Sequence, residues 1–196
     1  MNKEVLVFIF DGYADWEGAF ICPELLESKA GYVIRTISLD KNPKTSMGGF
    51  RVIPDYSVDD FPADFHILIL LGGKAWMSQA NDAVLPVAEY ADEHGIPIAA
   101  ICNAANFMAE HGFLDHRKHT GNTVEFMKSQ APHYAGEQYF LEEQAVCDSN
   151  MVTANGSASL EFAREILRCL KVKPEHEIAE WYRLHKEGFY GPGTRR

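Results

Sequence analysis

Residues 96–106 read Ile-Pro-Ile-Ala-Ala-Ile-Cys-Asn-Ala-Ala-Asn, an apolar run that passes through Cys102 into a stretch typical of a helix. A strand that turns sharply into a helix holds the junction residue out of the sheet, beside the first unpaired N–H groups of the helix. These groups carry partial positive charge and favour a thiolate, the reactive form of cysteine. Cys102 is therefore a candidate nucleophile, although a free cysteine is most often a small buried hydrophobe.

A second strand of the same kind ends in Gly72-Gly73. The seven residues before Gly72 are almost continuously apolar, which is typical of a central parallel strand covered on both faces. Ligands gather beyond the carboxyl ends of such strands, so Gly73 and Cys102 are expected to face each other. The N–H groups of Gly73 and Asn103 would then form an oxyanion hole. Taken alone, however, two glycines are more typical of an ordinary turn.

Glu17 follows the first apolar run, residues 5–10, and is expected in the first turn of a helix from Glu17 to about Lys29. This location puts its carboxyl group at the same edge of the sheet as Cys102. Acidic residues are common in first helical turns because they complement the helix dipole. Only a position beside the thiol would make Glu17 catalytic.

Together these motifs resemble the ThiJ/PfpI family of the class I glutamine-amidotransferase-like superfamily, over roughly residues 1–172. The resemblance rests on the N-terminal strand, Glu17, Leu71-Gly72-Gly73, the elbow at residues 100–105, and Val152-Thr153-Ala154-Asn155-Gly156 before a helix from Leu160 to Leu170. It implies an α/β fold, a flavodoxin-like three-layer α/β/α sandwich with a mostly parallel sheet and a nucleophile elbow. It also implies that Cys102 is the nucleophile, that Glu17 contacts it, and that Gly73 and Asn103 are the backbone oxyanion donors.

One departure from the family pattern affects the expected chemistry. Members that resemble the intracellular proteases carry a histidine directly after the nucleophile, whereas this chain has Asn103. His119, in the segment His-Thr-Gly-Asn at residues 119–122, is the remaining candidate for a base or polar contact near the thiol. A residue of a surface turn is an equally open interpretation of His119.

Composition excludes several classes of function. A chain of 196 residues with a net charge of −10 is expected to be one domain that does not bind nucleic acid, because phosphate binding relies on clustered Lys and Arg. The four cysteines show no metal-ligand spacing, and the glycines form no phosphate-binding pattern, so no metal or cofactor is expected. The longest apolar runs are too short for a membrane span, and the protein is predicted to be soluble and cytoplasmic.

Residues 173–196 lie outside the resemblance, which defines the domain at residues 1–172. Their first part, Pro174 to Lys186, predicts an amphipathic helix with Ile178, Trp181, Tyr182 and His185 on one stripe. This apolar face is expected to pack on the same domain or on a partner subunit, and residues 188–196 to form a loose tail. With the family resemblance, the stripe predicts a homodimer.

Two functional classes follow from these residues. The first is a cysteine-dependent hydrolase in which Cys102 attacks a peptide, an amide or a small reactive carbonyl compound. The second is a non-enzymatic redox-sensing or chaperone-like stress protein in which Cys102 is oxidised. In either class we expect Glu17 to hold a proton and to donate a hydrogen bond to the Cys102 thiolate, with the pKa of Cys102 well below the ~8.5 of a free thiol.

Overall fold

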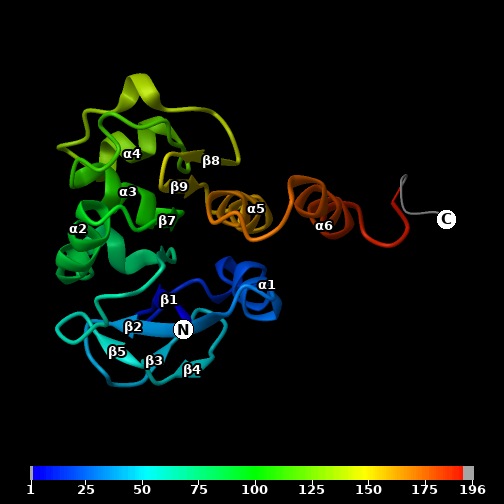
Figure 1. Cartoon of the computed structure of the whole chain (residues 1–196). Coiled ribbons are helices and arrows are strands. Elements are labelled where there is room, and N and C mark those ends of the chain that lie inside the picture. The colour runs from blue at the N-terminus through cyan, green and yellow to red at the C-terminus, as the bar shows by residue number, and fades with distance from the viewer. Residues whose placement is uncertain (1, 192–196) are drawn as a thin grey trace.

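The computed structural model describes residues 2–191 and contains one seven-stranded sheet, in the order β5-β2-β1-β6-β7-β9-β8 (Figure 1). Within this sheet all neighbouring strands are parallel except β8 and β9, which form an antiparallel hairpin. The strands are β1 (Lys3–Phe8), β2 (Tyr32–Ser38), β5 (Tyr56–Ser57), β6 (Ile67–Leu70), β7 (Ile98–Ile101), β8 (Ala145–Asp148) and β9 (Met151–Ala154). A separate hairpin consists of β3 (Lys44–Thr45) and β4 (Arg51–Val52).

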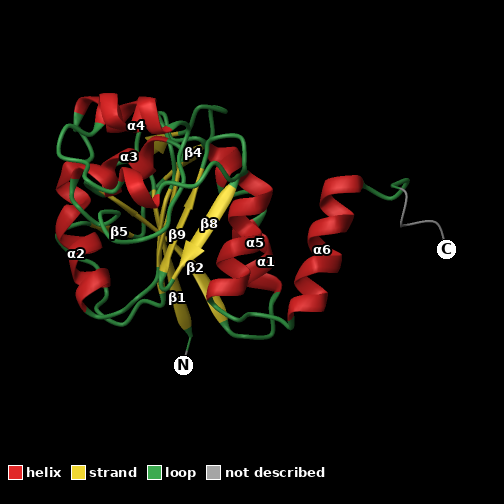
Figure 2. Ribbon diagram, turned by 90° about the horizontal axis from the view of Figure 1, so that it is seen from above, coloured by secondary structure: helices red, strands yellow, loops and turns green. Residues whose placement is uncertain are grey.

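Helices cover both faces of the sheet and make the fold a three-layer sandwich (Figure 2). On one face lie α1 (Ile21–Glu27) and α5 (Ser159–Cys169), and on the other lie α2 (Leu85–Glu93) and α3 (Asn103–Glu110). All residues of β6, β7 and β9 are buried, as expected for strands covered on both sides. The predicted α/β sandwich with a mostly parallel sheet is confirmed.

The first helix begins later than the sequence predicts. Asp15–Glu17 form a short 3₁₀ turn, and α1 begins only at Ile21. Glu17 is therefore not in the first turn of an α-helix, and its place in the site depends on this separate turn. Before this turn Gly12 has φ 79°, a conformation that glycine adopts readily, and the chain after it places Glu17 inside the protein.

A helix that the sequence analysis did not predict, α4 (Val124–Gln130), packs beside α3. Its start is specified by Thr123, whose hydroxyl oxygen accepts a hydrogen bond from the Phe126 N–H at 3.0 Å. A threonine that precedes a short stretch with an acidic residue in its first turn is a recognisable N-cap. This helix and the segment before it bring residues 119–123 to the edge of the sheet where Cys102 lies.

The C-terminal helix α6 (Glu175–Glu187) packs against α5 on the outside of the sandwich (Figure 2). Ile178 is buried, and the rings of Trp181 and His185 contact Phe20 at the start of α1. The Tyr182 hydroxyl donates a hydrogen bond to Glu161 on α5 at 2.8 Å. The apolar stripe therefore covers the chain's own α1 and α5, and it gives no support for a homodimer, which stays a prediction from the resemblance.

Two further predictions concern the C-terminal tail and membrane-spanning helices. Of the tail predicted for residues 188–196, residues 192–196 lie outside the described part of the chain. Across residues 2–191, none of the helices combines the length and the apolar character needed to cross a bilayer.

Candidate active site

The ends of four neighbouring strands meet at one edge of the sheet. The strands β1, β6, β7 and β9 lie side by side and parallel, so their carboxyl ends point in the same direction. The segments that follow them supply Glu17, Gly72-Gly73, Cys102 and Gly156 in that order. The site is therefore built from residues that are far apart in sequence but next to one another in the sheet.

Cys102 occupies the single residue between β7 and α3. Its backbone has φ 60° and ψ −128°, a conformation that a non-glycine residue rarely adopts. The Cys102 N–H donates a hydrogen bond to the Ala154 carbonyl oxygen at 2.9 Å, which ties the elbow to the end of β9. This strained turn holds the sulfur beyond the sheet, and such strain is characteristic of functional sites.

Glu17 is almost completely buried, with 1% of its surface exposed, and its carboxyl group lies against the elbow. Glu17 Oε2 accepts a hydrogen bond from the Gly72 N–H at 2.5 Å, and the carboxyl group is near enough to the Cys102 thiol for each to shift the pKa of the other. A Cβ atom on Gly72 would lie 2.6 Å from Cys102 Cβ and 2.7 Å from Glu17 Oε2. Position 72 must therefore be glycine for the acid and the thiol to meet.

Gly73 adopts a backbone conformation with φ +152°, and a Cβ atom there would lie 2.7 Å from both the Gly12 carbonyl oxygen and the Phe10 ring. Within residues 2–191 its N–H donates no hydrogen bond, so it remains available to a ligand. The Asn103 N–H acts to lower the pKa of the Cys102 thiol, and Asn103 Nδ2 donates to the Gly73 carbonyl oxygen at 3.1 Å. Asn103 thus links the two strand ends, and the roles of Gly73 and Asn103 as oxyanion donors stay predictions.

The sequence analysis did not single out two residues of the site, Asn122 and Gly156. Asn122 Nδ2 lies 3.7 Å from the Cys102 sulfur as a donor, and Asn122 Oδ1 accepts from the Gly156 N–H at 2.8 Å. A Cβ atom on Gly156 would lie 2.8 Å from the sulfur. The only signal in the sequence is that Asn122 ends the polar segment at residues 119–122 and that Gly156 ends the motif before α5.

His119 does not contact the thiol, and it is not a surface residue either. The side chain has no exposed surface, and its ring lies against Tyr134 and Phe140. Nδ1 lies 2.6 Å from the Arg117 carbonyl oxygen and Nε2 lies 2.7 Å from the Tyr134 hydroxyl, so both ring nitrogens are engaged. Burial lowers the pKa of His119, which keeps the ring neutral. These contacts make His119 a structural residue of the 119–122 segment and leave the predicted role as a base unsupported.

The proton between Glu17 and Cys102 is not arranged as the sequence analysis expected. Burial raises the pKa of the Glu17 carboxyl to about 7, although hydrogen bonds from Gly72 and Cys102 oppose the rise. Burial and then the Glu17 carboxylate raise the pKa of the Cys102 thiol, against the donors of Asn122 and Asn103. Because the carboxyl has the lower pKa, it loses its proton first. The expectation of a Cys102 pKa well below that of a free thiol is therefore wrong.

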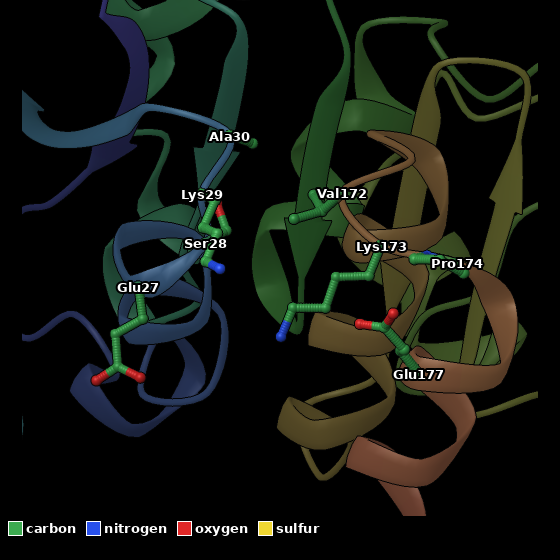
Figure 3. Close-up of a pocket in the computed structure, with 8 residues that line it drawn as sticks. All are labelled: Glu27, Ser28, Lys29, Ala30, Val172, Lys173, Pro174 and Glu177. Carbon is green, nitrogen blue, oxygen red and sulfur yellow. The ribbon is translucent and has the colours of Figure 1, made fainter.

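A small cavity of about 280 Å³ adjoins the site. Asn122 forms part of its wall and donates to the Cys102 sulfur, while the side chains of Glu125, Glu142 and Glu143 make other parts of the wall acidic. A larger cavity of about 530 Å³ lies between the end of α1 and the α5–α6 connection (Figure 3). There Lys173 extends toward α1 and pairs with Glu24. No residue of the candidate site lines this larger cavity, so size alone does not identify the site.

Comparison with known proteins places this geometry in a family. The chain matches the DJ-1/PfpI family over residues 3–169. It is 38% identical over 188 residues to the uncharacterized protease YdeA of Bacillus subtilis, covering 96% of this chain and 93% of that protein. It is 25% identical over 171 residues to the deglycase TK1284 of Thermococcus kodakarensis, covering 86% of this chain and 99% of that protein.

A solved structure agrees with the same assignment. The crystal structure of the thiJ/pfpI family protein from Bacillus anthracis superposes with a TM-score of 0.89 at 35% sequence identity, covering 95% of this chain and 91% of that chain. The elbow at Cys102 and the parallel sheet that carries it are thus set in a fold shared across nearly the whole chain. The chain belongs to the DJ-1/PfpI family.

Proposed function

We propose that this protein is a cysteine-dependent hydrolase of the DJ-1/PfpI type, in which Cys102 attacks the carbonyl carbon of a small substrate and Glu17 carries the proton. The observation that supports this proposal most strongly is the buried Glu17 carboxyl, which packs with Cys102 around Gly72 at a strained elbow and has a pKa of about 7. A group that titrates near the working pH is suited to both accept and donate a proton.

In this mechanism the resting pair is a thiol and a carboxylate. As the sulfur forms a bond to the carbonyl carbon, the thiol proton moves to Glu17, so no stable thiolate is needed beforehand. The carbonyl oxygen takes up the electron pair and accepts hydrogen bonds from the N–H groups of Gly73 and Asn103. Protonated Glu17 then returns its proton to that oxygen or to a leaving amine, and water releases the product from sulfur.

The cavity beside Asn122 favours a small, uncharged or positively charged substrate. The adjoining cavity has a volume of about 280 Å³, which suits a small carbonyl compound or a short amide better than a folded protein. The glutamates in its wall repel anions. The relatives named as a protease and a deglycase are consistent with chemistry at a carbonyl carbon, and glyoxals and short amides are the substrates to test first.

The test compares the wild type with Cys102→Ser and Glu17→Gln variants against a panel of glyoxals and short amides. We expect turnover and a transient mass adduct on Cys102 in the wild type only. Loss of a proton-transfer group should lower turnover by about 10²–10⁴-fold in Glu17→Gln. Iodoacetamide should still alkylate Cys102 in that variant, which shows that the thiol remains accessible. Turnover that persists in Cys102→Ser would refute the proposal.

The second candidate function is a redox sensor. Among the described residues, no histidine ring contacts the Cys102 sulfur, and Glu17 is the only titratable side chain that shifts the pKa of this thiol. A buried carboxyl with a pKa of about 7 can donate a proton to a cysteine sulfinate and stabilise it. A stable sulfinate on Cys102 after mild peroxide treatment, with no turnover of any carbonyl substrate, would favour the sensor over the enzyme.

A further inference from the structure

A second pair of thiols lies far from the elbow, where β8 turns into β9. Cys147 is on β8 and Cys169 is the last residue of α5. Each sulfur lies 3.9 Å from the same Ser149 carbonyl oxygen, and the two thiols are near enough to shift each other's pKa. Two sulfurs that both approach one carbonyl oxygen are neighbours in space, which is the first requirement for a disulfide between them.

The fold explains this proximity. Helix α5 packs along β8 and β9 and runs back against the direction of β9, so its end returns to the β8–β9 turn (Figure 2). In that turn Ser149 has φ 57°, which directs its carbonyl oxygen toward both sulfurs. Both cysteines are only partly buried, so a small oxidant can reach them. The parallel strands run away from this turn toward the Cys102 site, at the opposite edge of the sheet.

The two thiols are not equivalent. The neighbouring Cys147 thiol lowers the pKa of Cys169, although burial and Glu165 oppose this effect. The Cys169 sulfur, together with burial, raises the pKa of Cys147. A thiolate reacts with peroxide far faster than a thiol does. Cys169 is therefore suited to be oxidised first, and Cys147 is suited to attack the oxidised sulfur.

We propose that Cys147 and Cys169 are a peroxide-responsive dithiol pair that closes into a reversible intramolecular disulfide. In the first step the Cys169 thiolate attacks one oxygen of hydrogen peroxide, breaks the O–O bond and becomes a sulfenic acid, and the other oxygen leaves as hydroxide and takes up a proton to become water. In the second step the Cys147 sulfur attacks the Cys169 sulfur. The S–O bond breaks, the Cys147 proton and the hydroxyl group leave as a second water, and the two thiols have given two electrons to the peroxide.

The disulfide would join the β8–β9 hairpin to the end of α5, directly before the connection to α6. It would close a loop between residues 147 and 169, and a loop of this length restricts the unfolded chain considerably. For a protein of this size we expect the melting temperature to rise on oxidation by up to roughly 10 °C. The proposal is independent of catalysis at Cys102, because the two sites share no residue.

The experiment uses a variant that carries Cys22→Ser and Cys102→Ser, treated with a small excess of hydrogen peroxide. Mass spectrometry under non-reducing conditions should show the loss of two hydrogens and a cross-linked peptide pair that contains Cys147 and Cys169 within one chain. Dithiothreitol should reverse both this change and the rise in melting temperature. Peptide mapping of the peroxide-treated wild type provides the same readout if the double variant does not fold.

Two matched controls test the order of the steps. With Cys147→Ala added, dimedone should trap a sulfenic acid on Cys169 and no disulfide should form. With Cys169→Ala added, Cys147 should remain alkylatable at the same peroxide dose. Three results would each overturn the proposal. The first is that both cysteines stay alkylatable after peroxide treatment when both are present. The second is a disulfide between two chains, and the third is dimedone on Cys147 in place of Cys169.

Discussion

Replacing Glu17 with glutamine is predicted to stabilise the protein, and the gain is predicted to depend on pH. The folded structure raises the pKa of this carboxyl from its ordinary value of 4.5 to about 7, mainly through burial. A proton is then bound more tightly in the folded state than in the unfolded state. The wild type therefore keeps its full stability below about pH 4.5 and loses part of it as the pH rises through about 7.

The magnitude follows from the same pKa values. Each pKa unit corresponds to about 1.4 kcal/mol, so a rise from 4.5 to about 7 corresponds to about 3 kcal/mol of free energy of unfolding. Glutamine has the same shape, keeps an oxygen for the Gly72 N–H, and does not ionise. We expect the stability of Glu17→Gln minus that of the wild type to grow by about 3 kcal/mol between pH 4 and pH 8.

Urea unfolding of both proteins across this pH range measures the difference in their free energies of unfolding. The contributions of groups that titrate alike in both proteins cancel in this difference. Glu161→Gln is the matched control, because burial also opposes ionisation of Glu161 but hydrogen bonds from Lys186 and Tyr182 lower its pKa. Its substitution should therefore become more destabilising, not less, as the pH rises from about 3 to 7. If the stability of Glu17→Gln minus that of the wild type stays constant from pH 4 to pH 8, Glu17 is not a buried carboxyl with a raised pKa.

Three further substitutions test individual contacts of the site. Gly72→Ala should cost about 1–3 kcal/mol in urea unfolding and abolish turnover, because the new methyl group clashes with Cys102 and Glu17; normal turnover would contradict the close packing. Asn122→Ala should slow iodoacetamide alkylation of Cys102 at pH 8 by about fivefold, since one donor to the sulfur is lost; an unchanged rate would remove that contact. His119→Ala should cost about 1–3 kcal/mol of stability yet leave the pH midpoint of turnover in place; a shifted midpoint would make His119 the base.

The sequence was sufficient to predict the sheet and the elbow because both depend on local pattern. Continuous apolar runs that end in Gly72-Gly73 and in Cys102 are typical of buried parallel strands, and parallel strands bring their carboxyl ends to one edge. Glu17 could be placed at that edge on the same principle. Its 3₁₀ turn was not predictable, because the turn is set by contacts with the end of β6 and not by a local pattern.

The order of proton loss could not be predicted, because it depends on burial. A helix N-terminus beside a cysteine predicts a lowered thiol pKa, but burial of both Cys102 and Glu17 outweighs that effect in the folded structure. Asn122 and His119 are three residues apart in the sequence, yet only Asn122 reaches the sulfur. Which polar side chain of a loop points inward is decided by tertiary packing around Tyr134 and Phe140, and a single sequence does not reveal it.

The central claim, that Glu17 takes the proton of Cys102 as the sulfur attacks, is tested most directly by the pH dependence of adduct formation. The measurement is the single-turnover rate at which a small glyoxal forms an adduct on Cys102, followed by mass spectrometry from pH 5.5 to 8.5. Because the Glu17 pKa is about 7, the wild-type rate should rise by about tenfold between pH 6 and pH 8 with a midpoint near 7. Glu17→Gln should show a much lower rate with no midpoint there. A wild-type rate that rises only with ionisation of the thiol, unaffected by Glu17→Gln, would contradict the account.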